Sequence, residues 1–344
     1  MISRTRGRAA ARSAAVAAVL TILLSCELLF MAPIPDTSPQ AIFDQVWEFA
    51  DQEYSFFGFK GIDWQAAYES YQPRVESDMT DEELFDLLAE MLFILRDGHV
   101  NLRSPFDFSR NWRWYLDYPS NFDFTLLERN YFNDNQRYVG PFLTYDFGDV
   151  LYVRYASFSS GISPENLDYL FTTFVDRNGI ILDIRNNGGG YTDNAFMIAD
   201  RLVSESTSVA KERFKNGPAH DAFTPFETVG ISPPPGSPTW LKPFAVLTNR
   251  LSYSATNLLV TLIRDLPQVE VVGDWTGGGG GIPTFTELTN GWSLRVSAHQ
   301  LSTPDNVNVE AGLPPDIAVD MDPGDQAAGI DTILETALAY IRGL

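Results

Sequence analysis

Ser254 is the residue whose position in this chain best suits a catalytic nucleophile. An apolar, strand-like run from Ala245 to Thr248 stops at a polar turn, and Ser254 then precedes a helical pattern that begins near Asn257. At the first turn of a helix, unpaired N–H groups and the positive end of the helix dipole stabilise nearby negative charge. A serine at this place also commonly caps its helix through its side chain. This stretch alone leaves both interpretations open.

A serine nucleophile needs a base, and the chain contains three histidines: His99, His220 and His299. His99 follows Asp97 and Gly98 after a strongly apolar helical stripe, and Gly98 is expected to end that helix. A lone histidine is more often a structural hydrogen-bonding group than a catalyst. The three lie far apart, without the short ligand spacing of zinc enzymes, so neither a metal site nor a cofactor is predicted.

A glycine-rich turn could hold the negative charge that an attack by serine creates. Residues 179–185 indicate a buried strand, and it ends in Asn186-Asn187-Gly188-Gly189-Gly190. Consecutive glycines let backbone N–H groups converge on an oxyanion. A phosphate-binding loop would look similar, but no Lys-Ser/Thr pair follows the glycines, which disfavours nucleotide binding. A flexible turn is the structural alternative.

The elements that must position these residues fall into two main parts. From residue 150 onward strands and helices alternate, which predicts an α/β core, within an α+β chain, built on a parallel or mixed sheet covered by helices. Before it, apolar residues at helical spacing predict an N-terminal helical region. We divide the chain into a signal peptide (1–25), a linker (26–40), the helical region (41–103), an irregular aromatic-rich insert (104–149) and the core (150–344).

The N-terminus has the pattern of an export signal. Four arginines within the first 12 residues precede the apolar run 14–24, which is too short to span a membrane as a mature helix. The run ends Leu23-Leu24-Ser25-Cys26, and Cys26 is the only cysteine in the chain. This ending resembles the bacterial lipoprotein signal, which implies a lipid anchor on Cys26. Cleavage near Ala32 with loss of Cys26 is the alternative.

The charge of the chain limits its partners. The formal net charge is −21, and removal of residues 1–25 takes away four arginines and no acids, which leaves −25. Nucleic acids and acidic lipid surfaces both need clustered lysine and arginine, so a nucleic-acid partner is excluded. Membrane association would depend on the lipid anchor alone. We predict a protein exported to the periplasm or cell surface, and no pattern defines its oligomeric state.

Four motifs in the same order resemble the C-terminal processing (tail-specific) and tricorn-like serine peptidases. They are Asp97-Gly98-His99, Asp183-Ile184-Arg185-Asn186-Asn187-Gly188-Gly189-Gly190, Ser252-Tyr253-Ser254-Ala255 and Gly312-Leu313-Pro314-Pro315-Asp316-Ile317. The resemblance covers the helical region and residues 150–344, and it implies a crotonase-like catalytic core and polypeptide substrates. It places the nucleophile on Ser254 rather than Ser252, and the oxyanion N–H groups on Gly189 and Ala255.

The resemblance favours the branch of this family that uses histidine. In the processing peptidases a lysine acts as the base, but its place here falls on Gly279, and no lysine occurs after Lys242. A Ser-Lys dyad of that type is therefore excluded. Tricorn-like members use a histidine and a glutamate, whose places fall on His99 as general base and Glu310 as the orienting acid. Asp316 is the alternative for the orienting acid, and Asp265 is a secondary candidate for tuning the site.

Two departures keep other functions open. The roughly 50 residues before the core are too few for the PDZ domain that processing peptidases carry, and none is evident. The glycine run 277–281 also resembles retinoid-binding relatives, which bind lipids on this fold. The favoured function is an extracytoplasmic serine-type endopeptidase acting through an acyl-enzyme on Ser254. The alternatives are a non-catalytic binding protein for apolar ligands or peptides, and an exported structural lipoprotein with a decayed site.

Overall fold

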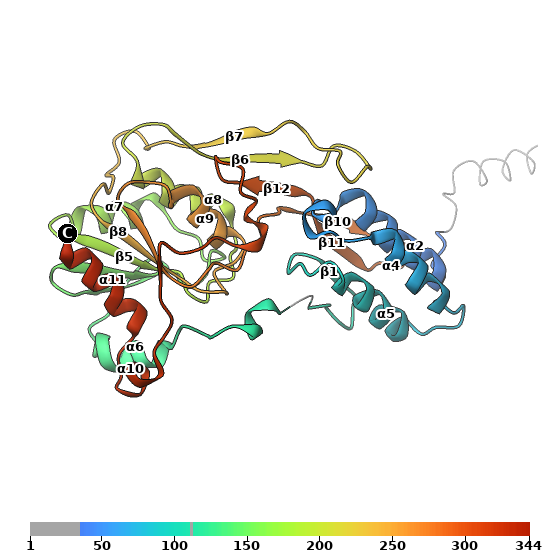
Figure 1. The fold of residues 1–344 in the computed structure, drawn as a ribbon, viewed down its shortest axis with the longest axis horizontal. Coiled ribbons are helices and arrows are strands. Elements are labelled where there is room, and N and C mark those ends of the chain that lie inside the picture. The colour runs from blue at the N-terminus through green and yellow to red at the C-terminus, as the bar shows by residue number, and fades with distance from the viewer. Residues whose placement is uncertain (1–34, 111–112) are drawn as a thin grey trace, which may run out of the picture.

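The computed structural model describes residues 35–110 and 113–344. The predicted signal peptide, most of the linker and Cys26 therefore lie outside the described residues. The described chain forms two lobes that lie side by side (Figure 1). Among the helices of these residues, none has the length and apolar character needed to cross a membrane.

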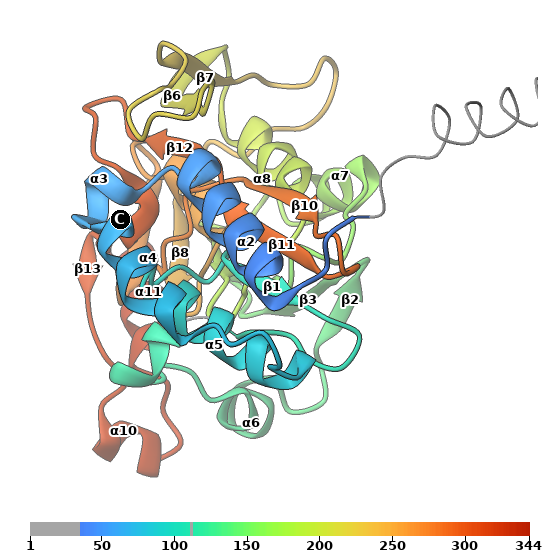
Figure 2. The same cartoon turned by 90° about the vertical axis from the view of Figure 1, so that its right-hand side faces the viewer.

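The N-terminal lobe consists of helices packed on a small sheet, as Figure 2 shows from the side of the helices. The prediction of a helical region is confirmed, and two of its helices have side-chain caps: the Asp63 side chain accepts the Ala66 N–H, and Thr80 and Glu83 make a capping box. The predicted end at Gly98 is wrong, because the last helix ends at Phe93. The helices are α2 (Pro39–Glu53), α3 (Phe57–Lys60), α4 (Trp64–Tyr71) and α5 (Asp81–Phe93).

Residues from far along the chain complete this lobe. Its sheet has the order β1-β11-β10, from β1 (Asn101–Arg103), β11 (Ser293–Ser297) and β10 (Pro283–Glu287). Trp292, Leu294 and Val296 belong to the same buried apolar cluster as the helices. The predicted division at residue 150 is therefore incomplete, because the helices need this hairpin to cover their apolar faces.

The core is a mixed seven-stranded sheet covered by helices on both faces, which confirms the predicted α/β core. Helices α7, α8 and α9 pack with one face, and α11 packs with the other. Five adjacent strands, from β13 at one edge to β4, run parallel, and the β2–β3 hairpin adds antiparallel pairing at the other edge. The strand order is β13 (Ile317–Ala318), β9 (Val269–Gly273), β8 (Phe244–Thr248), β5 (Gly179–Asp183), β4 (Val150–Arg154), β3 (Phe142–Asp146) and β2 (Arg137–Val139). The helices are α6 (Phe124–Leu127), α7 (Pro164–Thr173), α8 (Thr192–Ala199), α9 (Ala255–Ile263), α10 (Pro323–Ala327) and α11 (Thr332–Gly343).

A third sheet connects the two lobes. The hairpin of β6 (Thr207–Phe214) and β7 (Glu227–Ile231) extends from the core across the top of the molecule in Figure 1. It pairs with β12 (His299–Ser302), which follows β11 directly. The segment 104–149 is also not a separate insert, because β2 and β3 belong to the core sheet.

Candidate active site

Ser254 lies on a strained turn between β8 and α9. Its backbone has φ 61° and ψ −122°, a conformation that residues with a side chain rarely adopt. Its hydroxyl makes no capping hydrogen bond to the helix, so the capping interpretation is wrong. Instead, Ser254 Oγ lies 2.9 Å from His99 Nε2. A sharp strand-to-helix turn of this kind presents a serine hydroxyl at the edge of a sheet.

The surrounding backbone holds this turn from several directions. The Ser254 N–H donates to Gly278 O at 2.9 Å, and the Tyr253 N–H donates to Asn187 O at 3.0 Å. The Ser252 hydroxyl donates to Ile184 O at 2.9 Å. These bonds connect the turn to both glycine-rich segments and to the end of β5, and they can maintain the unfavourable dihedral angles.

His99 comes from the other lobe, in the segment between α5 and β1. Asp97 Oδ1 accepts the His99 main-chain N–H at 2.8 Å, and Arg295 Nε of β11 donates to His99 O at 2.9 Å. His99 as a whole is 7% exposed, and its ring packs against Tyr253. Burial lowers the pKa of His99 to about 4, and the nearby Asp97 carboxylate offsets only part of this effect. The imidazole is therefore neutral near pH 7 and able to accept a proton.

The Glu310 carboxylate makes two hydrogen bonds, and neither of them is to His99. Its Oε1 accepts Lys60 Nζ at 2.9 Å, and its Oε2 accepts the Gly280 N–H at 3.0 Å. His99 Nδ1 is buried and has no hydrogen-bond partner among the described residues. The direct contact expected of an orienting acid is thus absent from this structure, because Lys60 and Gly280 hold both carboxylate oxygens.

Sequence reasoning missed Lys60 and gave no role to Asp97. Asp97 stood in a motif that drew attention, and its place two residues before His99 allows a side-chain bond to that backbone. Lys60 carried no such signal, since it lies 250 positions before its partner Glu310. The structure places Lys60 between Asp97 and Glu310.

The two predicted oxyanion donors lie on either side of Ser254. The Ala255 N–H begins α9 and has no acceptor in residues 35–110 and 113–344. Gly189 has φ 94°, and a Cβ there would lie 2.7 Å from Ser254 Cβ, so this close approach requires glycine. The Gly189 N–H donates to Asn187 Oδ1 at 3.1 Å in this structure. An oxyanion would have to compete with that amide, and both assignments stay predictions.

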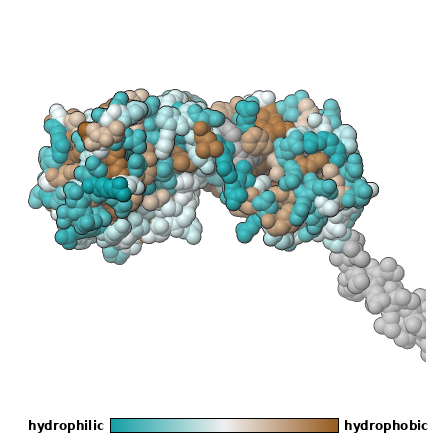
Figure 3. Space-filling view, turned by 90° about the horizontal axis from the view of Figure 1, so that it is seen from below, coloured by the Kyte–Doolittle hydropathy of each residue, from teal (hydrophilic) through white to brown (hydrophobic). Residues whose placement is uncertain are grey.

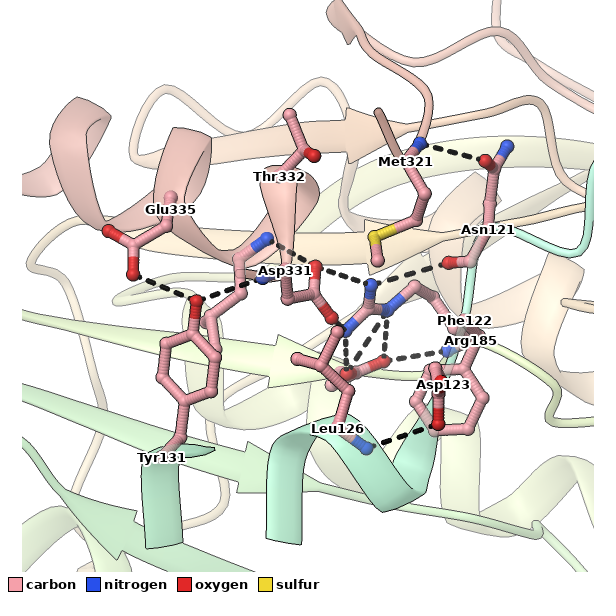
Figure 4. Close-up of polar contacts among 12 residues, drawn as sticks. Asn121, Phe122, Asp123, Leu126, Tyr131, Arg185, Met321, Asp331, Thr332 and Glu335 are labelled. Atoms are coloured by element: carbon pink, nitrogen blue, oxygen red, sulfur yellow. Dashed lines mark hydrogen bonds and ion pairs between the residues drawn. The ribbon is translucent and has the colours of Figure 1, made fainter. Parts of the chain in front are cut away.

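The glycine-rich turn follows a buried ion network, shown in Figure 4. Arg185 Nη2 lies 2.6 Å from Asp183 Oδ2 and 3.0 Å from Asp331 Oδ2, and all three side chains are fully buried. Arg185 Nη1 also donates to Asn121 O at 3.3 Å. Because Asp331 caps α11, the network joins that helix to the end of β5 immediately before Asn186.

The secondary candidates lie outside this site. Asp265 follows the C-terminal end of α9, with its side chain 64% exposed. Asp316 Oδ2 accepts the Val271 N–H at 2.9 Å, beside the core sheet. Neither lines the cleft that contains Ser254.

A cavity of about 700 Å³ lies between the lobes and contains both Ser254 and His99. In Figure 3 the surface is indented between the two lobes. The cavity also contains Gly279, where a Cβ would lie 2.4 Å from the Tyr253 ring. A lysine therefore has no space at that position. The apolar lining of the cavity includes Phe196, Val229, Leu258 and Leu301.

Known protein families match both the N-terminal helical region and the core of the chain. The family profile "Peptidase family S41" matches residues 149–319, and the profile "Tricorn protease C1 domain" matches residues 35–93. A chloroplastic C-terminal processing peptidase of Tetradesmus obliquus is 29% identical over 180 residues, 49% of this chain and 35% of the relative. A carboxy-terminal-processing protease of Bartonella bacilliformis is 26% identical over 204 residues, 57% of this chain and 45% of the relative. The chain thus spans less than half the length of these curated relatives.

One solved structure matches nearly the whole described chain. It is a candidate peptidase from Parabacteroides merdae, 42% identical, with a TM-score of 0.84. The match covers 89% of this chain and 97% of that one.

Proposed function

This chain belongs to peptidase family S41, and we propose that it is an exported serine-type peptidase that hydrolyses peptide bonds through an acyl-enzyme on Ser254. His99 accepts the hydroxyl proton as Ser254 attacks the scissile carbonyl carbon, then returns it to the leaving amine. Water hydrolyses the acyl-enzyme by the same proton transfers in the second half of the reaction. The observation that supports this most is the 2.9 Å separation of His99 Nε2 and Ser254 Oγ at a turn where the hydroxyl caps no helix.

The environment of the pair supports the same chemistry. A buried, neutral imidazole is in the form that a general base requires at neutral pH. The Ala255 N–H, and Gly189 once its bond to Asn187 is exchanged, would donate to the oxygen of the tetrahedral intermediate. Glu310 belongs to a charged cluster that includes Asp97, whose carboxylate faces the His99 backbone.

The walls of the cavity favour apolar substrate side chains. Leu258 lies one helical turn beyond Ser254, and Phe196 and Leu301 line the same cavity. A polypeptide bound with its carbonyl carbon at Ser254 would place a neighbouring side chain against this lining. Two relatives are named for processing carboxyl termini, which supports polypeptide carboxyl-terminal processing as the activity here.

Labelling with a serine-reactive fluorophosphonate tests the assignment of Ser254. The wild-type protein should label, Ser254→Ala should not, and His99→Ala should label much more slowly. Ser206→Ala is the matched control, because its hydroxyl lies outside the cavity and pairs with the Ser232 hydroxyl on the surface. It should keep its labelling provided that its melting curve shows a folded protein. Labelling that persists in Ser254→Ala would refute the assignment.

The same preparation distinguishes the peptidase from a binding protein. Peptide cleavage with labelling at Ser254 supports the proposal. Saturable binding of an apolar ligand by a wild-type protein that neither labels nor cleaves peptides would instead favour the non-catalytic alternative.

A further inference from the structure

We propose that Lys60 is a positioning residue of this site: its ammonium group pairs with Asp97 and Glu310 together and thereby links the histidine segment to the glycine run. This inference rests on the proposed function, since it assigns Lys60 a part in the same reaction. Lys60 is one of only four lysines in the chain, and it lies at the end of α3, in the opposite lobe from Ser254.

The Lys60 ammonium is enclosed by acceptors. Its Nζ lies 2.9 Å from Glu310 Oε1 and 3.7 Å from Asp97 Oδ2, and the Lys60 side chain is only 16% exposed. It also donates to the Tyr54 hydroxyl at 2.9 Å and to the main-chain oxygens of Leu95 and Arg96 at 3.3 and 3.1 Å. A charged group with so little solvent needs these partners, and the geometry requires a cation at this place.

Each acid connects Lys60 to a different part of the site. Asp97 holds the histidine segment, because its Oδ1 accepts the His99 N–H and its Oδ2 accepts the Ser297 hydroxyl at 2.9 Å. Glu310 holds the glycine run, because its Oε2 accepts the Gly280 N–H. That run in turn supports the nucleophile turn through the bond from the Ser254 N–H to Gly278 O.

The two acids compete for one cation. Burial, and next the Asp97 charge, raise the pKa of Glu310 to about 8, while Lys60 and the Gly280 N–H oppose this rise. Burial also opposes ionisation of Asp97, but Lys60, His99 and Ser297 outweigh it and lower the pKa of Asp97. The pKa of Lys60 is raised, because Glu310 and Asp97 outweigh the effect of burial. Lys60 therefore stays charged and cannot serve as a base.

The other groups that face this cluster do not replace Lys60. Burial raises the pKa of the Tyr54 and Tyr253 hydroxyls well above the usual value, so both are neutral. His99 is neutral above a pH of about 4. Arg295 contacts the main chain of the histidine segment and the Asn101 side chain, and within the described residues it makes no ion pair with either acid.

This arrangement predicts which protonation state is active. Ionised Glu310 binds the Gly280 N–H more strongly and so fixes the glycine run that supports the nucleophile turn, which makes the form with Glu310 ionised the competent one. Without Lys60, the repulsion between the two carboxylates is uncompensated, and Glu310 keeps its proton to higher pH. Below its pKa, the ionised fraction of Glu310 falls about tenfold for each pH unit by which that pKa rises.

Peptide-cleavage kinetics from roughly pH 5 to 10 test the proposal. In the wild type, kcat should rise with pH through about 8, the pKa of Glu310. Lys60→Met should move that rise upward by about one unit or more, lower kcat at pH 7 about tenfold and leave KM nearly unchanged. Glu310→Gln should lose this pH dependence, and adding Lys60→Met to it should produce no further shift. Lys60→Arg should restore the wild-type profile.

A matched control separates charge pairing from a structural effect. Lys242→Met removes a lysine that donates to the Val175 and Arg177 carbonyls, away from the site, and should leave the profile unchanged. A loss of kcat in Lys60→Met by one factor at every pH would overturn the proposal. So would an equal loss when Lys60→Met is added to Glu310→Gln.

A readout independent of activity covers the remaining outcomes. In carboxyl ¹³C NMR, the glutamate signal that disappears in Glu310→Gln should titrate near 8 in the wild type and higher in Lys60→Met. This decides the proposal even for a wild type that cleaves no peptide, an outcome that refutes the proposed function instead. If Lys60→Met fails to fold, folding of Lys60→Met/Glu310→Gln supports the pairing, and failure of both overturns it.

Discussion

The strained backbone conformation of Ser254 lowers the stability of the fold. At φ 61° and ψ −122°, the Ser254 Cβ crowds neighbouring main-chain atoms. A glycine has no Cβ and would adopt these angles readily. The hydrogen bonds from Tyr253, Ser254 and Ser252 hold the turn in place. The strain therefore presents the hydroxyl to His99 at the expense of stability.

Removing the Ser254 side chain should therefore stabilise the fold while abolishing the proposed activity. We expect Ser254→Gly to exceed Ser254→Ala in unfolding free energy by about 1 kcal/mol, because both lose the hydroxyl and only glycine relieves the strain. This difference corresponds to a rise in Tm of about 1–2 °C for a protein of this size. Calorimetry on the two variants measures it. Equal or reversed melting temperatures would contradict the idea that the turn is strained.

At the scale of elements, the end of β5 is fixed by charge rather than by apolar packing alone. Arg185 and its two aspartates are fully buried, so each depends on the others for compensation. The position of this strand end determines where Gly189 meets Ser254. The network thus supports the site without touching a substrate.

Breaking that network should cost much more than breaking an exposed ion pair. Arg185→Met leaves the buried Asp331 without its cation and Asp183 with only Arg154 at 3.7 Å, and we expect a loss of about 3–5 kcal/mol in unfolding free energy. Arg177→Met is the control, because Arg177 pairs with Asp146 at 2.7 Å on the surface, and its loss should cost less than about 1 kcal/mol. Urea unfolding of both variants provides the comparison. A similar cost for the two would show that burial of the network contributes nothing special.

The local elements were predictable from sequence, and the long-range pairings were not. The caps at Asp63 and Thr80 depend on residues three positions away, and the turn at Ser254 is a local change from strand to helix. The pairing of β1 with β11 joins residues nearly 200 positions apart, and periodicity contains no information on which strands pair. The approach of Lys60 to Glu310 is invisible for the same reason. The predicted contact between Glu310 and His99 is absent because Lys60, from the N-terminal lobe, binds the Glu310 carboxylate.

At the scale of the whole molecule, the site exists only where the lobes meet. Ser254 comes from the core, His99 from the N-terminal lobe, and β11 and β12 continue from one lobe to the other. Ser55, between α2 and α3, donates its N–H to Ser297 O and its hydroxyl to Ser297 O and His299 O, which holds the N-terminal lobe on the connection from β11 to β12. The distance between nucleophile and base therefore depends on the packing between lobes.

The negative net charge of the molecule limits how it can associate with a membrane. Residues 26–344 carry a net charge of −25, which repels acidic lipid surfaces. We therefore expect any membrane association to require the lipid proposed on Cys26. The wild type should incorporate labelled fatty acid and stay in the membrane fraction through a high-salt wash. Cys26→Ser should lose both the label and the membrane association.

A matched variant keeps this test specific. Ser25→Ala changes the neighbouring residue to one of similar size and should preserve lipidation if, as we propose, the thiol of Cys26 is the group that accepts the lipid. Fatty acid that is still incorporated into Cys26→Ser would refute lipidation at this residue. Salt-resistant membrane association without fatty acid would contradict the requirement for the lipid, because high salt screens charge attraction and would leave only another apolar attachment.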